Sequence, residues 1–164
     1  MLRSVRETAP AGLVPLAWAF AAAAHTGLLA ARAVLIGHVV MATLLFAFAA
    51  LSWSEMREHP VLRAWLAVIV LGFVVTLVGA YSLVVESGTL AAVTVFGWMA
   101  LPTLAFLYTG YVLPDEERSW AYMAGAGLSG VAAIGFAAGA SPLVTLALAG
   151  VGQTLGIAVA VVTY

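Results

Sequence analysis

Charged residues are bunched so tightly in this chain that they leave five uncharged stretches, each long enough to cross a bilayer. Six Arg and seven Asp or Glu are the only fully charged side chains among 164 residues. The stretches without Asp, Glu, Lys or Arg are 8–31, 33–54, 64–85, 87–114 and 119–164. A hydrocarbon core about 30 Å thick is crossed by roughly 20 helical residues, so the first four stretches predict one helix each and the last predicts two. The sequence therefore predicts an all-α integral membrane bundle of about six transmembrane helices, with very short loops and a single domain, 1–164.

The composition agrees with lipid as the solvent and excludes several classes of function. At 65% hydrophobic and 8% charged residues, a soluble globule of this size could not hide its apolar surface. A net charge of −1 without a basic run argues against nucleic acid as a partner. The absence of cysteine removes disulfides, thiolate metal sites and iron–sulfur clusters, and leaves His, Met and carboxylates as metal ligands.

Turn signals between the uncharged stretches set the expected helix boundaries. The predicted helices cover about 11–29, 33–53, 64–85, 90–113, 120–138 and 143–162. The segment 54–63, which carries four charges and the pair His59-Pro60, is expected to be the clearest aqueous loop. The run Gly139-Ala140-Ser141-Pro142 is the strong turn signal that divides the last stretch into two helices.

The distribution of arginine predicts how the bundle is oriented. With six crossings, one side of the membrane holds Arg3, Arg6, Arg57, Arg63 and Arg118, and the other side holds Arg32. Cytoplasmic loops carry the excess of basic residues, so both termini are expected in the cytoplasm of this multi-pass protein. Basic residues that are all Arg, together with abundant Ala, Val and Gly, are typical of a GC-rich prokaryotic genome, and a prokaryotic cell membrane is the expected location. The first segment also fits a cleavable signal peptide, although an uncleaved first helix is favoured.

Glycines in the last two predicted helices indicate close helix packing. Gly135 with Gly139, and Gly152 with Gly156, are small-xxx-small pairs, which let two helix backbones approach closely. We expect them to close an antiparallel hairpin between the fifth and sixth helices. The alternative is that these glycines form a face for self-association or for binding other membrane subunits. The lipid bilayer is the expected partner in either case.

Two polar features fall inside predicted helices. Pro102 removes the hydrogen bond that would reach the Trp98 carbonyl, so a kink is expected. That carbonyl and Thr103 either line a polar cavity or mark one of the harmless prolines that membrane helices tolerate, and the harmless reading is favoured. Gln153, the only amide in a predicted helix, lies near mid-membrane and is expected to bond to a neighbouring helix.

His25 and His38 are the only titratable side chains predicted to lie well within the hydrocarbon. Ionisable groups there are costly and are functional candidates by default. Each lies about six residues from the turn near Ala31 and Arg32, so both are expected roughly 10 Å below the same surface. Two imidazoles at one depth on neighbouring helices could face each other.

Three kinds of chemistry fit this pair. A haem b needs two imidazole ligands, although helices in a tight hairpin are 8 to 10 Å apart, which leaves little room for it. A copper site would add the thioether of Met41, one turn after His38, with Trp18 nearby. Proton handling would use one or both histidines, with Glu86 near the same side. The structural alternative is that each histidine is neutral and hydrogen-bonded within the hairpin.

The leading hypothesis is therefore a redox- or metal-linked membrane protein or subunit, with cofactor-binding residues His25 and His38 and metal ligands His25, His38 and Met41. The alternative is a non-catalytic structural or accessory subunit of a membrane complex, or a carrier of a small neutral solute. No GxSxG motif, paired intramembrane carboxylates or Ser/His/Asp set is present, so a hydrolase is not favoured and no catalytic residue is proposed.

Overall fold

Six helices make up the described part of the protein in the computed structural model. The structure describes residues 2–114 and 118–163, and it describes side chains within 11–114 and 118–162. The helices are α1 (Leu2–His25), α2 (Ala31–Glu58), α3 (Pro60–Val84), α4 (Gly88–Val112), α5 (Ser119–Ala137) and α6 (Pro142–Thr163). No strand occurs in the described ranges. The all-α bundle expected from the charge spacing is confirmed.

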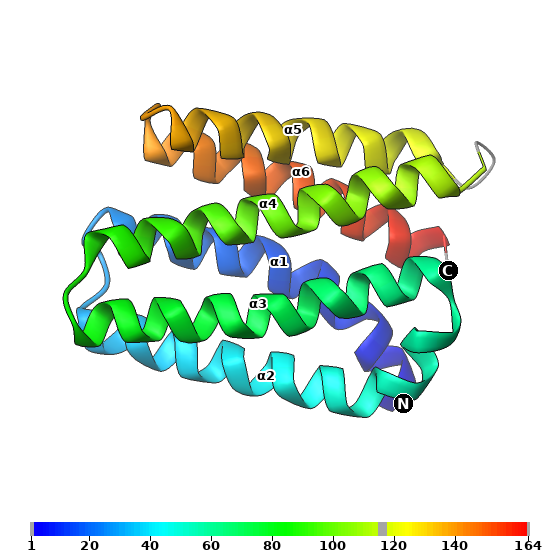
Figure 1. Ribbon diagram of the computed structural model, residues 1–164, viewed down its shortest axis with the longest axis horizontal. Coiled ribbons are helices and arrows are strands. Elements are labelled where there is room, and N and C mark those ends of the chain that lie inside the picture. The colour runs from blue at the N-terminus through cyan, green and yellow to red at the C-terminus, as the bar shows by residue number, and fades with distance from the viewer. Residues whose placement is uncertain (1, 115–117, 164) are drawn as a thin grey trace.

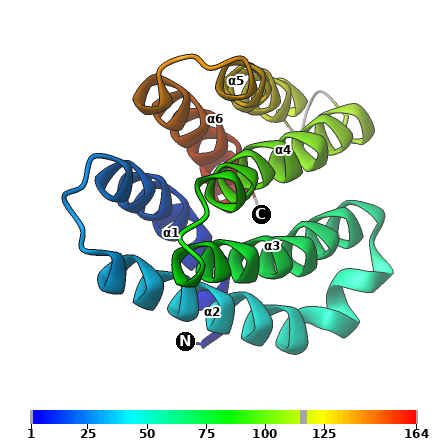
Figure 2. The ribbon, with the colours of Figure 1, turned by 60° about the vertical axis from the view of Figure 1, so that its left-hand side comes forward.

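Consecutive helices are antiparallel, and most pack on their neighbours in sequence (Figure 1). Helix α2 packs on α3, α3 on α4, α4 on α5 and α5 on α6, whereas α1 packs on α6, from the far end of the chain. Figure 2 shows α6 next to both α1 and α4. Short connections favour such antiparallel neighbours because no long crossover segment is available.

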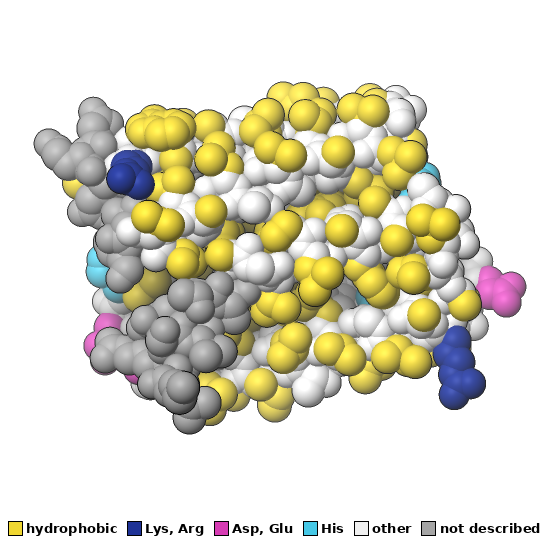
Figure 3. All heavy atoms as spheres, turned by 180° about the vertical axis from the view of Figure 1, so that it is seen from behind, with side chains coloured by type: hydrophobic (Ala, Val, Ile, Leu, Met, Phe, Trp, Pro, Cys, Tyr) yellow, Lys and Arg dark blue, Asp and Glu magenta, His cyan; other side chains and the backbone are white. Residues whose placement is uncertain are grey.

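Five of the helices, α2 to α6, are long and apolar enough to cross a membrane. Helix α1 is 24 residues long, but its described apolar part, Ala11–His25, is shorter. Figure 3 shows charged side chains at the two ends of one face and an apolar band between them. Large apolar side chains are exposed along this band, and lipid rather than water is the solvent that suits them.

Three turns at one end of the bundle are built in the same way. After each of α1, α3 and α5, one residue adopts the left-handed backbone conformation. These residues are Gly27 (φ +75°), Glu86 (φ +52°) and Gly139 (φ +80°). In each case the following amide donates to a carbonyl five residues earlier, as in the Leu28 N–H to Ala23 O bond of 3.0 Å. This Schellman arrangement satisfies carbonyls that the helix end would leave free.

The α2–α3 connection at the other end corrects a sequence prediction. The expected aqueous loop 54–63 is wrong, because α2 continues to Glu58 and α3 begins at Pro60. Only His59 separates the helices, in an extended conformation (φ −107°, ψ 132°). A residue before proline avoids the helical region and proline suits the first helical turn, so this dipeptide alone makes the turn.

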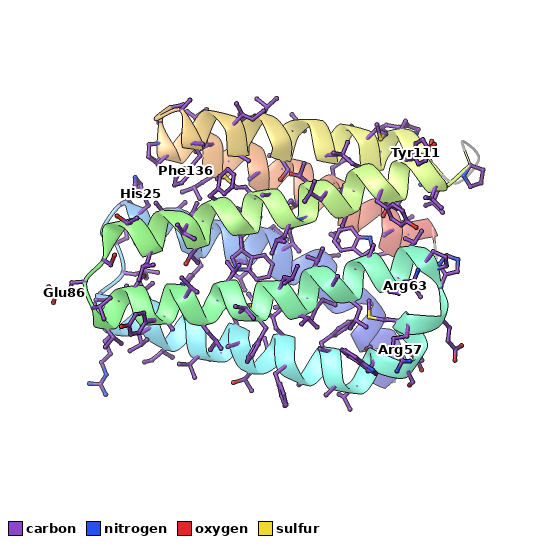
Figure 4. The ribbon with its side chains drawn as sticks, in the orientation of Figure 1. His25, Arg57, Arg63, Glu86, Tyr111 and Phe136 are labelled. Atoms are coloured by element: carbon purple, nitrogen blue, oxygen red, sulfur yellow. The ribbon has the colours of Figure 1, made fainter. Side chains whose placement is uncertain are left out.

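The described charges divide between the two ends. Figure 4 shows Arg57 and Arg63 on either side of the α2–α3 turn and Glu86 at the opposite end. Helix α1 begins and α6 ends at the arginine end (Figure 1). The side chains of Arg3 and Arg6, and residues 115–117, lie outside the described part. The cytoplasmic location of this end stays a prediction.

Candidate functional site

His38 has one ring nitrogen engaged and one nitrogen without a hydrogen bond. It lies on the half-buried face of α2, and its Nδ1 is 2.9 Å from the Val34 carbonyl oxygen one turn earlier. A carbonyl can only accept, so Nδ1 carries the proton, and Nε2 is the nitrogen that has a lone pair whenever the ring is neutral. Among the described residues no donor bonds to Nε2.

A glycine on the facing helix makes the space that Nε2 occupies. A Cβ at Gly79 of α3 would lie 2.5 Å from Nε2 of His38 and 2.8 Å from Cγ2 of Thr94. The Thr94 hydroxyl donates to the Leu90 carbonyl at 2.9 Å, so its proton is already used within α4. The imidazole is thus held between α2, α3 and α4 with its basic nitrogen toward Gly79.

The other two candidate ligands differ in their surroundings. Met41 is half-buried and lies one turn after His38 on the same face of α2. The buried residues of α2 include Val34, Ala42 and Ser52. His25 is exposed as the last residue of α1 (Figure 4), and α1 packs on α6.

Within the described ranges neither imidazole hydrogen-bonds the other, and no three His, Asp or Glu side chains come together. Chemistry at this site would therefore use one imidazole, the thioether of Met41 and at most one further ligand. The binding roles of His25, His38 and Met41 remain predictions.

A separate cluster of buried polar groups lies where α1, α4, α5 and α6 meet. Gln153 of α6 is buried, and its Oε1 accepts from the indole N–H of Trp18 at 3.0 Å. Its Nε2 donates to the Trp98 carbonyl at 2.9 Å and to the Ser129 hydroxyl at 3.0 Å. The Ser129 hydroxyl in turn donates to the Met99 carbonyl at 3.1 Å. One side chain therefore joins all four helices.

This cluster decides between the two interpretations of Pro102. The Trp98 carbonyl is the group that Pro102 leaves without its helical partner, and Gln153 supplies the missing donor. Thr103 donates to the Met99 carbonyl at 2.7 Å. These groups bond to one another, so the cluster serves helix packing. The sequence placed the proline and the glutamine in different helices and gave no signal that they meet.

Helices α5 and α6 pack closely through Gly152 as expected, but Gly125 rather than Gly139 supplies the contact from α5. A Cβ at Gly152 would lie 2.7 Å from Cβ of Leu128 and 2.9 Å from the Gly125 carbonyl oxygen, so Gly125 faces it. Gly156 is buried and faces Phe106 of α4. Self-association through the predicted glycines stays a prediction, although Gly152 and Gly156 already pack inside the chain.

Comparison with protein-family models, with curated proteins and with solved structures finds no match to this chain.

Proposed function

We propose that this multi-pass membrane protein binds a soft transition-metal ion, Cu(I) by preference, through Nε2 of His38 and the thioether of Met41. The observation that carries the proposal is the hydrogen bond from Nδ1 of His38 to the Val34 carbonyl. Metal-binding histidines commonly donate their second nitrogen to a carbonyl or carboxylate, which fixes the tautomer and aims the free nitrogen at the ion. His38 has that arrangement, and its free nitrogen has no competing donor in the described part.

The donor types favour copper over the other metals considered. Imidazole with a thioether suits Cu(I), whereas calcium and magnesium require oxygen ligands. Two neutral ligands leave the single charge of Cu(I) uncompensated in a low-dielectric region, so we expect exchangeable rather than permanent binding. His25 remains the candidate for a further ligand, and it would have to approach from α1.

Haem b fits this geometry less well. Nε2 of His38 lies against Gly79, and a haem bound to it would have to separate α2 from α3. The ligand pair His25 and His38 stays the alternative for haem, and a Soret band in the visible spectrum of purified protein would favour it.

The test is an anaerobic Cu(I) titration of purified protein against a chromophoric chelator. We expect about one ion per chain for the wild type. His38→Ala should weaken binding at least about tenfold, and Met41→Leu should weaken it to a smaller degree. His59→Ala, at the exposed α2–α3 turn, is the matched control and should leave the affinity unchanged. Equal affinities of the wild type and His38→Ala would overturn the proposal.

A second candidate, an accessory subunit of a membrane complex, is favoured by the exposure of α2. Only 6% of its most apolar stretch is buried, against 39% for α5. A photo-crosslinker at Phe46 of α2 should then give a product of one defined mass in native membranes. The same probe at Val131, similarly exposed on α5, should give none. Identical products from both positions would exclude a specific partner on α2.

A further inference from the structure

An open groove lies between α2 and α3 next to the α2–α3 turn, away from His38. Its volume is about 310 Å³, and its walls carry two arginines, one tryptophan and three apolar side chains. The lining residues are Trp53, Arg57, Arg63, Leu66, Ala67 and Val70. Both arginines are exposed and lie at the same end of the bundle (Figure 4).

The two guanidinium groups are available for an outside ligand. In the described part of the chain, neither Arg57 nor Arg63 forms an ion pair or a hydrogen bond through its side chain. Of the nearby carboxylates, Glu55 has an interaction of its own and Glu58 does not line the groove. A guanidinium presents a planar set of donors that matches phosphate oxygens, so two of them at one groove favour an anionic phosphate group.

The order of residues along the groove follows the chemistry of a phospholipid. Arg63, Leu66, Ala67 and Val70 are spaced i, i+3, i+4 and i+7, so they form one face of α3. From Arg63 to Val70 the helix rises about 10 Å, which takes the groove from a charged end to apolar walls. Trp53 completes the wall on α2, and tryptophan favours the headgroup level of a bilayer.

From this order we propose that the groove binds one anionic phospholipid, with its phosphate on Arg57 and Arg63 and an acyl chain along Leu66, Ala67 and Val70. Basic pockets between transmembrane helices suit anionic headgroups in this way. A free phosphate ion would use only the charged end and would leave the apolar walls uncovered. A partner helix would need acidic residues opposite both arginines, whereas every anionic phospholipid already carries the phosphate.

Native mass spectrometry of the purified protein with added lipid tests the site. With phosphatidylglycerol we expect one lipid per chain that survives activation, whereas phosphatidylcholine of the same chain length should be lost earlier. Arg57→Gln and Arg63→Gln should each weaken phosphatidylglycerol binding about fivefold, and the double variant about 30-fold. Equal retention of the two lipids by the wild type would overturn the proposal. This comparison uses only the wild-type protein, so it does not depend on whether a variant folds.

Two further variants separate a lipid from a bare anion. Ala67→Phe fills the apolar part of the groove and leaves both arginines in place, so it should displace phosphatidylglycerol. Arg118→Gln, an exposed arginine outside the groove, should not change lipid binding. If inorganic phosphate competes with the lipid as well as glycerol-phosphate lipids do, or if Ala67→Phe binds like the wild type, the site is a headgroup-only anion site and the proposal fails.

Discussion

The bundle has a tightly joined region, α4 to α6 with Trp18 of α1, and an open region around α2. In the joined region, small residues let the helices approach, and Ala121, Ala132 and Ala149 are fully buried. In the open region, α2 packs on α3 and exposes most of its length. The most apolar stretches of α2 and α3 are more hydrophobic than those of α4 to α6, so hydropathy alone does not explain the closer packing of the joined region.

The difference shows what holds membrane helices together. Lipid tails are as apolar as the side chains, so association depends on close packing and on hydrogen bonds between helices. The joined region has both, through glycine contacts and Gln153. Among the described residues, the open region has polar groups without a hydrogen-bond partner, namely Nε2 of His38 and the guanidinium groups of Arg57 and Arg63. These are the groups to which we assign ligands.

The largest expected effect is at the α5–α6 contact. Valine at Gly125 would place a Cβ 2.8 Å from the Gly152 carbonyl oxygen, where the neighbour is backbone and cannot turn aside. We expect Gly125→Val to lower the free energy of unfolding by about 3 kcal/mol, measured by denaturant titration in detergent. A Cβ at Gly127 on the same helix has no atom of another helix within 4 Å, so Gly127→Val is the control. Equal losses for the two variants would show that the contact is not tight.

The next effect concerns Gln153. Gln153→Leu leaves the Trp98 carbonyl and the Trp18 indole N–H without partners, so we expect a loss of about 2 kcal/mol of unfolding free energy. In a Pro102→Ala background the new amide N–H of residue 102 can bond to the Trp98 carbonyl. Gln153→Leu should then lower the free energy of unfolding by less. A double-mutant cycle should give a coupling of about 1 kcal/mol. A coupling near zero would mean that the glutamine does not replace the bond lost at the proline.

A third prediction concerns the space beside His38. Gly79→Ala would place a methyl group 2.5 Å from Nε2, so the imidazole would have to move. We expect about tenfold weaker Cu(I) binding and a loss of about 1 kcal/mol of unfolding free energy. Gly88→Ala, at a position with no atom nearby, is the control for both measurements. Unchanged Cu(I) affinity in Gly79→Ala would count against a site at Nε2.

The smallest effect is at Glu86, a left-handed residue (φ +52°) in a turn whose counterparts are glycines. Glu86→Gly should raise the free energy of unfolding by about 0.5 kcal/mol, because relief of the conformation exceeds the added freedom of the unfolded chain. Glu86→Ala removes the charge but keeps the Cβ, so it should bring no gain. Equal gains from both variants would assign the effect to charge.

The charge spacing was sufficient for the membrane bundle, because each uncharged stretch needs a helix to satisfy its backbone groups in lipid. The same spacing was misleading near His59, where it predicted a loop. There α2 and α3 both extend beyond their apolar stretches, through segments that carry charged residues. The depth of Gln153 could be read from its distance to the turn. Its bond to the Trp98 carbonyl could not, because that bond depends on how α4 and α6 are rotated against each other.

The candidate site was predicted only in part for the same reason. Depth along the helix singled out His38, and helical spacing added Met41. The tautomer of His38 and the role of Gly79 depend on the register between α2 and α3, which no single helix encodes. Sequence depth also grouped His25 with His38, without information on which helix α1 would pack against.

The most direct measurement is ¹⁵N NMR of histidine-labelled protein, with and without a Cu(I) mimic such as Ag(I). We expect His38 to show a protonated Nδ1 and an unprotonated Nε2 and, on addition of the ion, a shift of Nε2 that is absent for His59. A protonated Nε2 in the free protein, or an Nε2 resonance of His38 that does not move with the ion, would contradict the assignment of metal binding to this side chain.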